Sequence, residues 1–121
     1  MGTNHEDKTK ENRITEEAFF RCISDAATGT AGVYDLADGF GDSLSMNILG
    51  KKSFRRGIKT SRGETGPVAD IFIVVQYGVH IPDVAFNLQS NVKRALRKEF
   101  DIKAEAVNIH IEGVHTTKDK K

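Results

Sequence analysis

The sequence predicts an α+β domain in which a small mixed or antiparallel sheet carries two helices packed on one of its faces. Two segments have apolar residues at helical spacing, others have the dense or alternating apolar patterns of strands, and turn residues separate them. The predicted order is helix, strand, strand, strand, helix, strand. The length of 121 residues suits one such domain, because folding units commonly run ~100–150 residues.

The first helix is expected to begin at Thr15, whose hydroxyl can accept a hydrogen bond from the first helical turn. One face then carries its apolar residues: Ala18, Phe19, Cys22, Ile23, Ala26 and Ala27. Gly29 is expected to end the helix, because glycine accepts the left-handed conformation of many C-terminal caps. A short strand over residues 32–37 should follow.

Two further strands, joined by a turn, are predicted in the middle of the chain. They cover residues 57–62 and 68–77, with glycines and Pro67 between them. Residues 71–75 form a run of five apolar side chains without alternation, which is typical of a central strand covered on both faces.

The last predicted strand contains residues 107–112, where apolar and polar side chains alternate, so only one of its faces should be covered. If the strands share one sheet, Phe72 and Val74 lie on its less covered side. We expect a protein contact there, most simply with another copy of the chain.

The second helix is predicted around Pro82, which suits a first helical turn because its missing N–H would be unpaired there in any case. Its apolar stripe contains Val84, Ala85, Leu88, Val92, Ala95 and Leu96. The opposite arc contains Lys93, Arg94, Arg97 and Lys98. Phe86 also falls on this polar side, so it is a further candidate for a protein contact or for packing under residues 38–56.

No residue pattern indicates a catalytic, metal or cofactor site. Cys22 lies on an apolar helix face, and a buried structural thiol is expected there rather than a nucleophile. His110 and Glu112 share a strand face but lack further ligands at a recognisable spacing. We therefore expect a non-enzymatic protein that uses no cofactor and binds no metal.

The formal net charge of +1 conceals a separation of charge along the chain. Residues 14–50 carry one basic and six acidic side chains, whereas residues 51–62 carry six basic ones and no acid. This basic patch for an anionic partner consists of Lys51, Lys52, Arg55, Arg56, Lys59 and Arg62. Nucleic acid and anionic lipid both fit it, as does a solvated loop without a partner. Complementary charges also allow head-to-tail self-association.

The ends of the chain are polar, and residues 1–13 and 116–121 are expected to be disordered tails on a single domain of residues 14–115. One cysteine suits a reducing compartment, and no run approaches the ~20 apolar residues that span a membrane. A cytoplasmic protein without direct membrane insertion is predicted.

Several short motifs together resemble a known family. They are GVYDLA at residues 32–37, RGIK at 56–59, YG at 77–78, IPDVA at 81–85, LQ at 88–89, VK at 92–93 and VNIHIEGV at 107–114. They are similar to motifs of the alkaline shock protein family of Gram-positive bacteria, the general-stress or envelope-stress-response proteins. The resemblance covers about residues 14–115. It implies a cytoplasmic protein without known catalytic residues, linked to cell-envelope homeostasis, with a tendency to self-associate and, in some members, a separate membrane-anchor protein.

These observations favour a non-enzymatic cytoplasmic stress-response module that acts by self-association and by docking protein partners, a membrane-anchor protein among them. Its predicted contact residues are Phe72, Val74 and Phe86. The alternative hypothesis is an accessory nucleic-acid-binding domain that uses the basic residues between 51 and 62.

Overall fold

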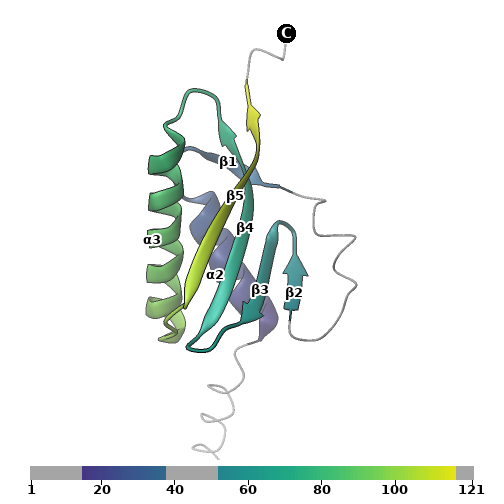
Figure 1. Ribbon diagram of the computed structural model, residues 1–121, viewed down its shortest axis with the longest axis vertical. Coiled ribbons are helices and arrows are strands. Elements are labelled where there is room, and N and C mark those ends of the chain that lie inside the picture. Colours follow the sequence, from purple (N-terminus) through teal and green to yellow (C-terminus); the bar gives the residue numbers. More distant parts are fainter. Residues whose placement is uncertain (1–14, 38–51, 117–121) are drawn as a thin grey trace, which may run out of the picture.

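The computed structural model describes residues 15–37 and 52–116, so the predicted tails lie outside the described residues except for Thr116. Its elements in chain order are α2 (Glu16–Thr28), β1 (Val33–Leu36), β2 (Lys52–Arg55), β3 (Ile58–Arg62), β4 (Pro67–Gln76), α3 (Ile81–Phe100) and β5 (Ala106–His115). Both helices pack on one face of a five-stranded sheet (Figure 1). The predicted α+β class is confirmed, and the structure adds the strand β2 to the predicted elements.

Strand β4 is the centre of the sheet, because three other strands pair with it. Strand β5 runs parallel to it along one side, from the pair Val68–Ala106 to the pair Gln76–His115. On the other side, β3 pairs antiparallel with the first half of β4, and β1 pairs antiparallel with the second half. Strand β2 continues the sheet beyond β3. The sheet is therefore mixed, which is one of the two predicted alternatives.

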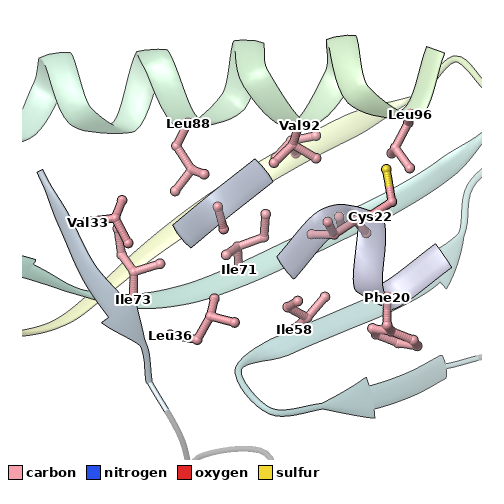
Figure 2. Packing of buried hydrophobic residues seen from close by; sticks show 14 of the residues in the cluster. Phe20, Cys22, Val33, Leu36, Ile58, Ile71, Ile73, Leu88, Val92 and Leu96 are labelled. Carbon is pink, nitrogen blue, oxygen red and sulfur yellow. The ribbon is translucent and has the colours of Figure 1, made fainter. Parts of the chain in front are cut away.

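Alternation along β4 divides the sheet into a helix side and an open face, on which no described helix lies. The helix-side residues of β4 are at most 2 % exposed: Ala69, Ile71, Ile73 and Val75. They belong to one core with Ile23 of α2 and with Leu88, Val92 and Leu96 of α3 (Figure 2). Each large aliphatic side chain buried in this way contributes about 1.5–3 kcal/mol, so this layer supplies much of the stability.

The amino end of α2 is capped as predicted, because the Thr15 hydroxyl accepts a hydrogen bond from the Ala18 N–H at 3.0 Å. The helix also ends at Gly29 as predicted, but the proposed left-handed conformation is wrong: Gly29 has φ −86°, within the right-handed region. The left-handed residue of this turn is Gly32, with φ +94°. Gly29 instead continues the helical conformation, and its N–H bonds to the carbonyl oxygen of Asp25.

Helix α3 begins with Pro82 in its first turn, as predicted, and ends at Asp101, which has the left-handed φ of 59°. Its buried residues are Val84, Leu88, Val92 and Leu96, all members of the predicted apolar stripe. The single-sided pattern of β5 is confirmed as well, since Val107 is buried and Asn108 is exposed.

Gly32 lies where a side chain would collide with α3. A Cβ atom at this position would stand 2.6 Å from Cγ2 of Val84, whereas no described atom lies within 4 Å of a Cβ built at Gly78. Both glycines have a positive φ, so both alanine variants carry similar backbone strain. We expect Gly32→Ala to lower the free energy of unfolding by about 1–3 kcal/mol more than Gly78→Ala does. Urea unfolding of the two variants measures this difference, and equal losses would contradict the packing argument.

Candidate functional site

The three predicted contact residues have very different surroundings. Phe72 is only 7 % exposed, because its ring stacks on the imidazole of His110 with centroids 4.3 Å apart and planes 13° from parallel. Val74 lies on the same open face and is half-buried. Phe86 projects from α3 away from the core and is 65 % exposed. Of these three side chains, Phe86 therefore has the largest fraction accessible to a partner.

A polar cluster surrounds Phe72 on the open face. Oδ1 of Asp70 accepts a hydrogen bond from Nδ2 of Asn108 at 3.1 Å and lies 3.0 Å from Nε2 of His110. The parallel register creates this arrangement, since it pairs Asp70 with Asn108 and Phe72 with His110. The Asp70 side chain is only 14 % exposed. The cluster thus ties β5 to β4 and satisfies a largely buried carboxylate.

This cluster holds an aspartate and a histidine in contact, a combination that also orients catalytic bases. The chain's one cysteine, Cys22, lies on α2 and therefore on the other side of the sheet. The thiol and the imidazole of His110 consequently cannot act as a nucleophile and base. The geometry supports a structural role for the Asp70–His110 pair.

Asp70→Ala should lower the free energy of unfolding by about 1–3 kcal/mol, because it leaves Asn108 and the partly buried His110 without their acceptor. Thermal or urea unfolding at pH 7 measures the loss. The exposed Asp25 of α2 provides a matched control, and Asp25→Ala should change the stability by less than about 0.5 kcal/mol. Equal effects of the two substitutions would show that the cluster contributes nothing.

Cys22 is buried, with 9 % exposure. Burial raises the pKa of its thiol above the ordinary value of 9.0, and the carboxylates of Glu99 and Asp25 raise this pKa further. Both causes disfavour the thiolate, which is the reactive form. The chemistry of Cys22 is therefore that of a packing residue.

We expect the Cys22 thiol of the folded protein to react with DTNB at pH 7.5 at least about tenfold more slowly than in guanidinium chloride. As the pH rises, its reactivity should level off only beyond pH 9.0, because the raised pKa keeps part of the folded thiol protonated there. A pH series of the folded protein, with the unfolded chain as the control, measures both. Rapid reaction near neutral pH would instead reveal an activated thiol.

Strands β4 and β5 finish and helix α3 begins at one end of the molecule (Figure 1). Exposed large apolar residues lie near the ends of these elements and on β1. The described residues of this apolar end, each at least 38 % exposed, are Tyr34, Tyr77, Ile81, Phe86 and Val114. Tyr34 and Tyr77 are linked through His115, since the Tyr77 N–H bonds to the His115 carbonyl and the Tyr34 ring stacks on His115 with centroids 3.8 Å apart. Of these five residues the sequence singled out only Phe86, because it alone interrupts a polar helix face.

The basic patch predicted from the sequence is distributed over several surfaces. Lys51 and the side chain of Lys52 lie outside the described residues. Arg55 and Arg56 flank the β2–β3 turn and form ion pairs with Glu16 at 4.0 Å and with Asp35 at 3.4 Å.

The other two members of the patch lie elsewhere on β3. Lys59 pairs in register with Asp70, at the open face, and Arg62 is exposed at the far end of the strand. The structure instead brings Arg55 and Arg56 together with Arg21 of α2 around one groove. Sequence spacing gave no sign of this, because Arg21 is more than thirty positions away.

The described residues contain no group of three or more histidine, cysteine, aspartate or glutamate side chains placed to hold a metal ion. Among the helices of this part of the chain, none has the length and apolar character needed to cross a bilayer.

The model of the alkaline shock protein 23 family, described as having a cell envelope-related function, matches residues 4–116 of the chain. The protein belongs to this family, and the resemblance seen in its motifs is confirmed.

Relatives from two bacteria are similar to much of the chain. The uncharacterized protein Spy1535 of Streptococcus pyogenes is 38% identical over 98 residues, which cover 79% of this chain and 72% of that protein. The uncharacterized protein YloU of Bacillus subtilis is 30% identical, over 86% of this chain and 88% of that protein. A stress response regulator gls24 homolog of Streptococcus pyogenes is 24% identical, and the match covers 70% of this chain but only 48% of that protein.

Among solved structures, variants of MamM-CTD show a partial likeness. One of them matches with a TM-score of 0.48 and 16% sequence identity, over 82% of this chain and 98% of that one.

Proposed function

We propose that this protein is a non-enzymatic cytoplasmic module of the cell-envelope stress response that works by associating with itself and by docking protein partners. The family supplies the link to the envelope, and the stress response regulator gls24 homologs supply the link to stress. The exposure of the large apolar side chains at the apolar end is the observation that supports self-association and docking.

Exposed apolar side chains cost free energy in water and mark interaction surfaces when they lie together. Tyr34, Tyr77 and Phe86 at the apolar end are 50–72 % exposed, and they are the most exposed aromatic residues among those whose side-chain burial the structure describes. Aromatic side chains such as these dominate the binding energy of many protein interfaces. We therefore assign the apolar end to protein contact.

Helix α3 adds a charge pattern that suits a second copy of the same chain. Its first half contains a single charged residue, Asp83, whereas its second half contains Lys93, Arg94, Arg97 and Lys98. Two copies that met head to head through basic halves would repel each other. A head-to-tail arrangement, in which the basic half of α3 in one copy faces acidic residues of its neighbour such as Asp25 of α2, avoids this repulsion.

Docking of a separate membrane-bound partner would place the module at the envelope. Phe86 is the best candidate contact residue, since it is exposed on a surface that a partner can reach. Val74 remains a candidate on the open face. Phe72 is covered within the chain and is expected to act indirectly, by holding His110 in place.

Light scattering over a range of concentrations tests self-association through Phe86. The mass of the wild-type protein should rise with concentration, and Phe86→Ala should weaken association about thirtyfold, the effect of losing a hot spot worth about 2 kcal/mol. The neighbouring exposed Asn87 provides the control, and Asn87→Ala should behave like the wild type. A wild-type protein that stays monomeric throughout, or a Phe86→Ala variant that associates equally well, would refute the proposal.

A further inference from the structure

A groove opens on the helix side of the sheet, between α2 and the β2–β3 hairpin, and encloses about 250 Å³. Its floor is apolar and consists of Phe20, Leu36 and Ile58. These three side chains lie on the part of the core nearest the hairpin (Figure 2), and each is at most 4 % exposed. Because core packing fixes the floor, the groove exists before any ligand arrives.

The residues that line the groove carry more positive than negative charge, while Glu16 and Asp35 lie beside two of its arginines. Three guanidinium groups contribute to the lining, from Arg21 of α2 and from Arg55 and Arg56 beside the hairpin turn, against one carboxylate, Glu17. Arg55 lies over the ring of Phe20, 5.1 Å from its centroid, so its charge is held directly above the apolar floor. An anionic group next to an apolar group would complement this arrangement.

The ion pairs that already involve these arginines are weak. The side chains of Arg55 and Glu16 are 46 % and 57 % exposed, with N and O atoms 4.0 Å apart. The pair between Arg56 and Asp35 is similarly exposed. Exposed pairs of this kind contribute about 0–1 kcal/mol, so an incoming carboxylate can displace or join them at little cost.

We propose that this groove binds an acidic peptide segment of a partner protein, with one apolar side chain on the floor and flanking carboxylates on Arg21, Arg55 and Arg56. The inference rests on the proposed docking function and names the chemistry of one partner. The volume of about 250 Å³ lies below the ~300–1,000 Å³ typical of small-molecule sites, so it suits a side chain rather than a metabolite. A guanidinium group can also form two parallel hydrogen bonds to one carboxylate, which fixes the relative orientation of the two groups.

The acidic residues around the groove favour a peptide over nucleic acid. Glu16, Glu17 and Asp35 stand among the arginines, and a continuous phosphate backbone would be repelled by each of them. A peptide places its carboxylates individually, so they can contact the arginines and avoid the acids. The small accessible part of the apolar floor offers nothing to a phosphate backbone, whereas a leucine or phenylalanine side chain can contact it.

Nuclear magnetic resonance titration of the full chain tests this site. The probe is a short synthetic peptide in which glutamates flank a leucine–phenylalanine pair, added up to millimolar concentration. We expect the arginine Nε–Hε signals of Arg21, Arg55 and Arg56 and the amide of Ser24 to shift. Arg21→Glu should weaken binding at least about tenfold, since it replaces a charged hydrogen-bond donor by a repelling carboxylate.

Arg94→Glu on α3 provides the matched control, because Arg94 is also an exposed helical arginine but lies away from the groove. It should change the affinity less than about twofold. The proposal is overturned if the groove signals do not move, if Arg94→Glu weakens binding as much as Arg21→Glu, or if a single-stranded oligonucleotide binds the groove more tightly than the peptide. Light scattering and peptide titration of Phe86→Ala separate the two proposals, since this variant should lose self-association and still bind the peptide, because Phe86 does not line the groove.

Discussion

The pairing of β5 with β4 is the interaction on which the rest of this structure depends. The chain leaves β4, forms α3 and returns as β5, which then pairs in parallel with β4 over nearly its whole length. A parallel return requires a crossover long enough to span the sheet, and α3 supplies it. The same pairing places Asp70 beside Asn108 and Phe72 beside His110, so the open face gains its polar cluster from it. It also brings the end of β5 next to Tyr77, which creates the apolar end.

Because both helices cover one side of the sheet, the surfaces of the molecule differ in polarity and in how well they are covered. The proposed function follows from these differences. The open face is closed locally by ring stacking and by hydrogen bonds to a carboxylate rather than by another layer. The apolar end and the arginine-lined groove share no residues, so one copy of the chain has room for two kinds of contact. Such separate surfaces suit the docking role proposed for this member of a family with a cell envelope-related function.

The elements that local interactions specify were predictable. Thr15 caps α2, Pro82 opens α3, and the apolar stripe of α3 predicts its four buried residues, because capping and helical periodicity act over a few positions. The left-handed conformation was predicted for Gly29 but is found at Gly32. Its position depends on tertiary packing, because a side chain at residue 32 would contact Val79 and Val84. Strand β2 was not predicted, because its residues lack an apolar pattern and it is specified by pairing with β3.

The sequence by itself determined the α+β class, both helices, the central strand and the family, because periodicity, helix caps and motifs depend on residues that are close together in the sequence. Only the tertiary structure decided which side chains are available to a partner. Phe72 and Phe86 look equally apolar in the sequence, yet a stacked imidazole covers the first and nothing described covers most of the second. The basic residues near Arg55 form one run in the sequence, but the pleat of β3 and the turn direct them to different surfaces. Exposure and charge clustering depend on contacts between distant segments, and those exist only after the chain has folded.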